Sequence, residues 1–231
     1  MRLRIYIGLA LALFAAGALA GDLETGLRSY KANDYPAAAK LLTRAANAGS
    51  AQAQTILGWM NLMGEGMPKD AAQAAAWYRK AALQGNSSAQ YNLGLLFGNG
   101  DGVKQDSAQA LSWFRKAAEQ GDPRAQYNVA LIYWSGMGVP RDSKQAIAWY
   151  EKAASQGMPD AQFMLGVLYE KGDQLPQNYI EAYKWYTLAE AKGVGQAGKA
   201  KDLAAARMDP AQVAQARKRA SAWTSDHAQA R

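Results

Sequence analysis

Hydrophobic positions recur along this chain at the spacing of an α-helix. One apolar face is formed at i, i+4, i+7 and i+8 by Ala89, Leu93, Leu96 and Phe97. After a loop, a second face follows at i, i+3, i+4 and i+7, formed by Ala110, Trp113, Phe114 and Ala117. The pattern contains no strand signal, so it predicts an all-α hairpin of two helices.

The same hairpin pattern returns every 36 residues. Alanines that begin successive units stand at Ala53, Ala89, Ala125 and Ala161. Tryptophans of the second helix keep the spacing at Trp77, Trp113, Trp149 and Trp185. A fixed period in this range is typical of a solenoid, in which each unit contacts mainly its neighbours. The predicted units are 53–88, 89–124, 125–160 and 161–196, and a less regular first unit covers 22–52.

Turn residues also fall at fixed places in each unit. Glycines follow the first helix at Gly64, Gly100, Gly136 and Gly172, and others follow the second helix at Gly85, Gly121, Gly157 and Gly193. Glycine adopts positive φ at little cost, which suits tight loops and helix C-terminal caps. Asp70, Asp106 and Asp142 precede the second helices and are predicted N-caps.

These motifs resemble the Sel1-like repeat, a relative of the tetratricopeptide repeat with a longer glycine-rich loop. The resemblance rests on Ala-Gln-Tyr-Asn-Leu-Gly from Ala89, on Gly100-x-Gly-Val, and on Ala-x-x-Trp-Phe-x-Lys-Ala-Ala-x-Gln-Gly from Ala110. It implies a right-handed superhelix of about five hairpins over 22–196 and a role as an adaptor for protein–protein contacts. Units one and five depart from the pattern: unit one lacks the Gly-x-Gly loop, and Gln174 and Glu190 replace a glycine and an alanine in unit five.

The two ends of the chain differ from the repeat array. Arg2 and Arg4 precede an apolar run from Ile5 to Gly17, and Ala18-Leu19-Ala20 has the small-x-small form of a cleavage site. Residues 1–20 therefore read as a secretory signal peptide, with a retained membrane anchor as the alternative. At the other end we expect capping helices over 197–224 and a disordered tail over 225–231.

The residue inventory offers little material for catalysis. The chain has no cysteine and one histidine, His227, and its formal charge is +7. A metal site of several His and Cys ligands cannot be assembled from these residues, so we expect no metal and no cofactor. A cell-wall enzyme or penicillin-binding module, as suggested for cysteine-rich relatives, is the disfavoured alternative because the cysteines and a Ser-x-x-Lys motif are both missing.

Candidate partner-binding residues lie on the first helix of each unit. Two residues after each opening alanine, Tyr91, Tyr127 and Phe163 form an aromatic ladder with Thr55. Such rings can anchor a peptide, although packing between neighbouring hairpins is the favoured interpretation. Trp134 occupies a place where the other units have Leu62, Gly98 and Glu170, so we expect it to face solvent or a groove. Trp59 is a further candidate, for which a core position is favoured.

A row of basic residues on the second helices, including Lys80, Lys116 and Lys152, reads as a solvated face rather than a binding stripe. Taken together, the sequence predicts a non-catalytic adaptor, exported to the bacterial periplasm or secreted. We expect a monomer that binds a protein or peptide and no nucleic acid, with no membrane span after signal cleavage.

Overall fold

The computed structural model describes residues 21–172 and 174–228. The predicted signal peptide and residues 229–231 of the predicted tail lie outside the described residues. Throughout the described ranges the regular structure is helical, without any strand, which confirms the all-α prediction. The chain forms two compact units, one up to Ala117 and one from Ala118 onward.

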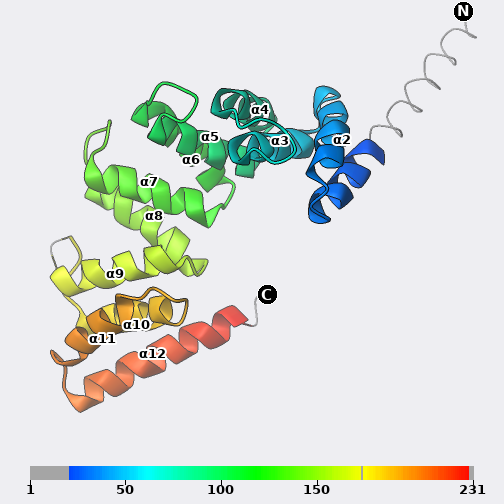
Figure 1. The fold of residues 1–231 in the computed structure, drawn as a ribbon. Coiled ribbons are helices and arrows are strands. Elements are labelled where there is room, and N and C mark those ends of the chain that lie inside the picture. The colour runs from blue at the N-terminus through cyan, green and yellow to red at the C-terminus, as the bar shows by residue number, and fades with distance from the viewer. Residues whose placement is uncertain (1–20, 173, 229–231) are drawn as a thin grey trace, which may run out of the picture. The chain divides into compact units, whose positions relative to one another are not determined.

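The first unit is a series of helices in which sequential neighbours pack together (Figure 1). A helix covers residues 21–31. It is followed by α2 (Tyr35–Asn47), α3 (Ala51–Met63), α4 (Ala71–Leu83), α5 (Ser87–Asn99) and α6 (Ser107–Glu119), the last of which crosses the boundary between the units. Helix α3 packs against α2 and α4, and α4 packs against α5, as the repeat pattern predicts.

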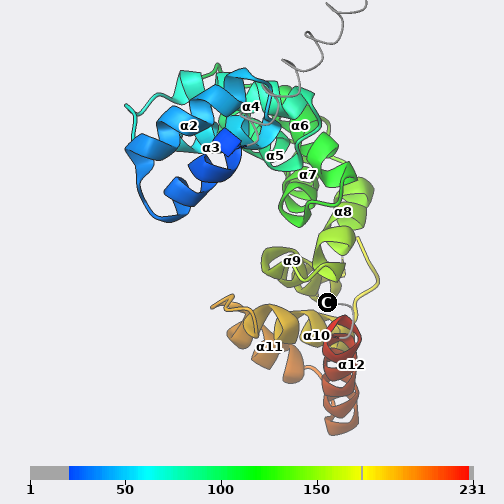
Figure 2. The same cartoon turned by 90° about the vertical axis from the view of Figure 1, so that its right-hand side faces the viewer.

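The second unit continues with sequential hairpins and ends in two additional helices (Figure 2). Its helices are α7 (Pro123–Ser135), α8 (Ser143–Ser155), α9 (Pro159–Lys171), α10 (Tyr179–Glu190), α11 (Ala197–Ala205) and α12 (Pro210–Ala228). Helix α10 contacts α9, α11 and α12, and both views show α12 beside α10. Helix α12 therefore covers a face of α10.

The helix caps agree with the sequence. The carboxylates of Asp70, Asp106 and Asp142 each accept a hydrogen bond of 2.9 Å from the backbone N–H three residues later. Asp209 caps α12 in the same way, and its own backbone N–H donates in return to the Gln212 side-chain oxygen at 3.0 Å. These caps satisfy N–H groups that the helices themselves leave unpaired.

Two loop glycines are required by close backbone contacts. A Cβ built on Gly66 would lie 2.3 Å from the Tyr35 carbonyl oxygen, and one on Gly102 would lie 2.2 Å from the Ala71 carbonyl carbon. Both glycines also have positive φ, at 69° and 67°. In the first unit, each Gly-x-Gly loop therefore rests on the start of the preceding second helix, where no larger residue fits.

The interior of each hairpin combines a small residue with an aromatic ring. Tyr78, Tyr150 and Tyr186 have no exposed surface. Tyr78 lies against Gly58 and Tyr186 against Gly166, where an added Cβ would come within 2.6 Å and 2.5 Å of the ring. Trp77, Trp113 and Trp185 are also buried and Trp149 is half-buried, which supports the prediction that the repeated tryptophans belong to the scaffold.

The two irregular repeats differ from the others as well. The first unit's initial hairpin has a short turn at Asn33, whose φ is 60°, in place of the Gly-x-Gly loop. In the last repeat Glu190 is exposed and its carboxylate forms an ion pair of 2.6 Å with Lys201 of α11, whereas the equivalent Ala154 is fully buried. Helix α12 extends to Ala228, so it continues past the expected boundary at 224 and includes most of the expected tail.

Candidate functional site

The aromatic ladder of the first helices is half-buried and contacts the scaffold. Ring centroids are 5.7 Å apart for Tyr91 and Phe114, 5.8 Å for Tyr127 and Tyr150, and 5.5 Å for Phe163 and Tyr186. Each ring thus packs on the second helix of its own hairpin, with part of its surface open. Burial, assisted by the charge of Asp160, raises the pKa of Tyr127. Such contacts agree with the packing interpretation, and a partner-binding role for the ladder stays a prediction.

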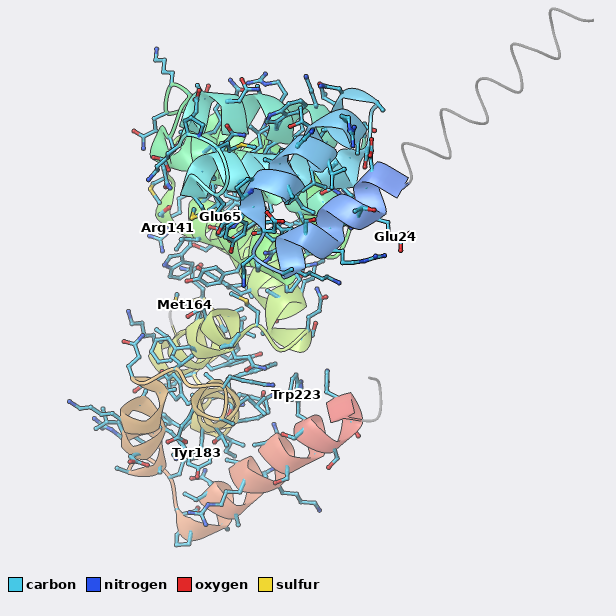
Figure 3. The ribbon with its side chains drawn as sticks, turned by 45° about the vertical axis from the view of Figure 1, so that its right-hand side comes forward. Glu24, Glu65, Arg141, Met164, Tyr183 and Trp223 are labelled. Atoms are coloured by element: carbon cyan, nitrogen blue, oxygen red, sulfur yellow. The ribbon has the colours of Figure 1, made fainter. Side chains whose placement is uncertain are left out.

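Trp134 lies near the end of α7 and is half-buried. The guanidinium of Arg141 lies 4.9 Å from its ring centroid, within range of a cation–π interaction. Figure 3 labels Arg141, which follows the Gly136–Gly138 loop. The indole is thus partly covered by a long, flexible side chain from a loop, which a partner can displace more readily than a helix.

Trp59 is exposed, and the expectation that it belongs to the core is wrong. Its side chain is 43% accessible, and that of Met63 one turn later is 49% accessible. The equivalent positions Leu95, Leu131 and Val167 are half-buried, so this row lies at the edge of the core. An indole is larger than these aliphatic groups and extends beyond that edge into solvent.

A tyrosine of the first helix lies close to this tryptophan. The Tyr30 hydroxyl donates a hydrogen bond of 3.0 Å to the Glu65 carboxylate. Burial and that carboxylate raise the pKa of Tyr30 to about 12, against a smaller opposing effect of a hydrogen bond with Trp59. Trp59 is thus exposed beside the half-buried pair of Tyr30 and Glu65 in the first unit.

The basic row of the second helices is stacked on the repeated tryptophans. The Nζ atoms of Lys80, Lys116 and Lys152 lie 4.2, 4.0 and 3.9 Å from the ring centroids of Trp77, Trp113 and Trp149. Each ammonium group therefore lies within range of a cation–π interaction with an indole, and the three lysines are exposed to water. This arrangement explains the row as a part of the scaffold, in agreement with the sequence interpretation.

A cavity of about 780 Å³ lies in the second unit beside the C-terminal turns of α12; we call it the α12 cavity. It is lined by Ser155, Gln156, Gly157, Gln162, Leu188, Ala191, Lys192, Trp223, Thr224 and His227. The His227 ring stacks on Trp223 with 3.8 Å between centroids, and Trp223 meets Trp185 edge-on at 6.3 Å. In Figure 3, Trp223 projects from α12 toward the preceding helices.

Sequence reasoning missed this cavity because it assigned residues 225–231 to a disordered tail. The available signal was the helical spacing of Ala216, Ala220, Trp223 and His227, at i, i+4, i+7 and i+11. Ala216 and Ala220 are buried in the structure, so this row is the face of α12 that packs on the rest of the unit.

Three polar side chains that line the α12 cavity bond to the backbone of their own helices. The hydroxyls of Ser155 and Thr224 donate to the carbonyls of Lys152 and Ala220 at 2.8 and 3.0 Å. His227 Nδ1 lies 2.8 Å from the Trp223 carbonyl oxygen. Each of these side chains is thus directed at its own helix, and no nucleophile–base pair is formed among them.

Two further kinds of feature are absent from the residues that the structure describes. Within 21–172 and 174–228, His, Asp and Glu side chains form no group of three that could hold a metal ion. No helix in the same ranges is both long and apolar enough to cross a membrane.

Five consecutive segments of the chain match the Sel1 repeat: residues 10–50, 51–86, 87–122, 123–158 and 159–194. The chain belongs to the Sel1 repeat family. The matched segments from 51 onward begin two residues before the units expected from the alanine spacing. As a Sel1 repeat protein, the chain has a scaffold that is typically protein-binding and related to the tetratricopeptide repeat.

Solved structures of other Sel1 repeat proteins resemble this one. A Sel1 repeat protein from Oxalobacter formigenes is 34% identical with a TM-score of 0.71, over 76% of this chain and 72% of that one. A protective antigen of uropathogenic Escherichia coli, c5321, is 28% identical with a TM-score of 0.62, over 93% of this chain and 55% of that one. A Klebsiella pneumoniae Sel1 repeat protein, at 21% identity and a TM-score of 0.51 over 83% and 95% of the two chains, shares the fold. No curated protein matches the sequence.

Proposed function

We propose that this Sel1 repeat protein is a non-catalytic adaptor of the bacterial cell envelope that binds a protein partner through the first-helix surface around Trp134. The observation that carries the proposal is the half-buried indole of Trp134. It stands at a non-repeating position, and the guanidinium of Arg141 lies over its ring. Large aromatic residues at such positions are typical binding hot spots. The half-buried ring of Tyr127, on the same helix, extends the surface.

The cellular location is part of the proposal and rests on the sequence. A basic start, an apolar run and Ala18-Leu19-Ala20 favour export, with the periplasm as the destination and secretion as the alternative. The absence of cysteine agrees with a scaffold whose stability comes from helix packing alone.

A non-catalytic role is favoured by the state of the polar groups. Within the described residues the hydroxyls and the imidazole that line the α12 cavity are bonded to backbone carbonyls, and the buried tyrosines belong to the hairpin interior. The repeat family is mostly made of scaffolds, which supports the same conclusion.

The proposal is tested by crosslinking in cells followed by affinity recovery of the full-length chain from an envelope fraction. A Trp134→Ala variant is compared with a Met137→Ala variant, because Met137 is an exposed apolar residue three positions later. Circular dichroism confirms that both variants are folded. We expect a specific protein that is recovered with the native chain and with Met137→Ala but is lost with Trp134→Ala.

Equal recovery by both variants would contradict the assignment of the surface around Trp134. A saturable enzymatic activity that a single side-chain change abolishes would contradict the adaptor function itself.

A further inference from the structure

Buried glutamines connect successive hairpins by a repeated pair of hydrogen bonds. In the first unit, Gln54 Nε2 donates to the Ala46 carbonyl at 2.9 Å, and Gln54 Oε1 accepts from Gln84 Nε2 at 2.8 Å. In the second unit, Gln126 Oε1 accepts from Gln156 Nε2 at 2.8 Å in the same way. Both ends of the buried amide are thus satisfied, as a side chain removed from water requires.

The last of these glutamines lacks its second partner. Gln162 has no exposed surface, and its Nε2 donates to the Ala154 carbonyl at 3.2 Å. Its Oε1 has no donor, because the residue 36 positions after Gln156 is Lys192, whose side chain is exposed. A buried acceptor without a donor costs about 1–3 kcal/mol, so Gln162 favours any ligand that supplies an N–H.

The unpaired amide belongs to the lining of the α12 cavity, together with Lys192. In the two complete pairs a glutamine, Gln84 or Gln156, stands at the position that Lys192 occupies here, and the Lys192 side chain is exposed. The volume of about 780 Å³ is within the range of small-molecule and peptide-binding cavities.

The remaining lining residues define the chemistry of that ligand. Trp223, backed by the stacked His227 ring, and the buried Leu188 provide apolar surface for a side chain. Lys192 contributes a cation at the edge, and the lining contains no Asp or Glu. The site therefore combines an N–H acceptor, an apolar wall and a positive charge.

We propose that the α12 cavity binds a short acidic segment of a peptide. An apolar side chain packs on Trp223 and Leu188, and a neighbouring carboxylate pairs with Lys192. Gln162 Oε1 has no exposed surface in the free protein, so a peptide N–H reaches it only when the side chains that cover it move aside. The site shares no residue with the surface around Trp134, so it stands without the proposed adaptor function.

The test uses the full-length chain labelled with ¹⁵N-tryptophan and titrated with acetyl-Leu-Asp, which carries peptide N–H groups, a leucine side chain and carboxylates. The indole signal of Trp223, assigned with a Trp223→Phe variant, reports on the cavity. We expect a saturable shift of the Trp223 signal and no shift of the Trp59 signal. A Trp223 signal that does not respond at millimolar probe would overturn the proposal.

Two charge-matched variants separate the cavity from general electrostatics. Lys192→Gln removes a cation and supplies the amide that Gln162 lacks, so acetyl-Leu-Asp should bind about tenfold more weakly or not at all. Lys152→Gln removes an equivalent cation outside the lining, and binding should change by less than about twofold. Thermal unfolding verifies that both variants are folded.

Three results would overturn the assignment. Binding to Lys192→Gln as tight as to the native chain would exclude the role of Gln162 and Lys192. Equal binding of acetyl-Leu-amide would exclude the carboxylate. A shift of Trp223 with N-acetylglucosamine but not with acetyl-Leu-Asp would assign the cavity to an amino sugar instead of a peptide.

A Trp134→Ala variant that still binds acetyl-Leu-Asp would show that this site and the adaptor surface are independent.

Discussion

Two consecutive hairpins of the second unit, α7–α8 and α9–α10, place a buried glutamine at the same position of the first helix. Gln126 is bonded through both ends of its amide, whereas Gln162 is bonded through Nε2 alone, since Gln156 is matched by Lys192 in the next hairpin. Gln162 keeps the hydrogen bond to the preceding hairpin, from its Nε2 to the Ala154 carbonyl. Helix α12, which carries the stacked rings of Trp223 and His227, packs against α10 of the same hairpin. This difference shows that one departure from the repeat, at Lys192, leaves a buried polar atom unsatisfied in the lining of the α12 cavity.

The largest expected effect compares the interior of the α9–α10 hairpin with the exposed surface of α11. Leu165 has no exposed surface, and Leu165→Ala should reduce the free energy of unfolding by about 2–5 kcal/mol. Leu203 on α11 is 56% exposed, and Leu203→Ala should change it by less than about 0.5 kcal/mol. Urea unfolding followed by circular dichroism measures both. Equal losses of unfolding free energy in the two variants would contradict the close packing of Leu165 in the hairpin interior.

A second prediction compares the two buried tyrosines of the same hairpins. The Tyr186 hydroxyl donates to the Glu170 carboxylate at 2.5 Å, and burial together with this carboxylate raises the pKa of Tyr186. The Tyr150 hydroxyl is buried without a partner. Tyr186→Phe should therefore destabilise the protein by about 1–2 kcal/mol, and Tyr150→Phe should stabilise it by up to about 1 kcal/mol. Thermal unfolding at neutral pH measures the pair, and shifts of the same sign would contradict the prediction.

The features that the sequence predicted are those that depend on local chemistry. Aspartate caps and positive-φ glycines act within a few residues of their own position, so Asp70, Asp106 and Gly100 could be assigned from spacing alone. The repeated Trp and Ala faces likewise follow from the helical period. These local rules were sufficient for the hairpins, their order and the five repeats.

The candidate site depends on contacts between distant residues, which the sequence pattern does not specify. Glutamine is usually exposed, so nothing local indicates that Gln162 is buried against the Ala154 carbonyl. His227 follows a polar stretch that resembles a disordered tail, and its position is set by stacking on Trp223. The error at Trp59 has a related cause, because a row that is half-buried with aliphatic residues cannot cover an indole.

The difference between Gln126 and Gln162 is tested by one substitution in each direction. Lys192→Gln restores the side-chain amide present at Gln84 and Gln156, and it should stabilise the folded chain by about 0.5–1.5 kcal/mol. The converse change, Gln156→Lys, should remove the donor to Gln126 Oε1 and destabilise the chain by about 1–3 kcal/mol, the cost of an unpaired buried acceptor. Both are measured by thermal unfolding without ligand. A destabilising Lys192→Gln would mean that the Gln162 oxygen is not available to a side chain at position 192.

The smallest expected effect concerns how α12 is held against α10. Glu181 on α10 forms ion pairs with Lys184 and with Arg219 of α12, each at 2.5 Å. Burial acts to raise the pKa of Glu181, but the hydrogen bonds and charges of these two partners outweigh it, so the pKa is lowered from 4.5. A carboxyl with a lowered pKa contributes stability that is present above pH 4.5 and is lost as the pH falls through its folded-state value. Arg219→Ala should cost less than about 1 kcal/mol at neutral pH, because the arginine is partly exposed, and should flatten the loss of stability as the pH falls below 4.5. Thermal unfolding of the native and variant chains, compared as the pH falls below 4.5, measures this loss, and identical pH profiles would assign the attachment of α12 to apolar packing alone.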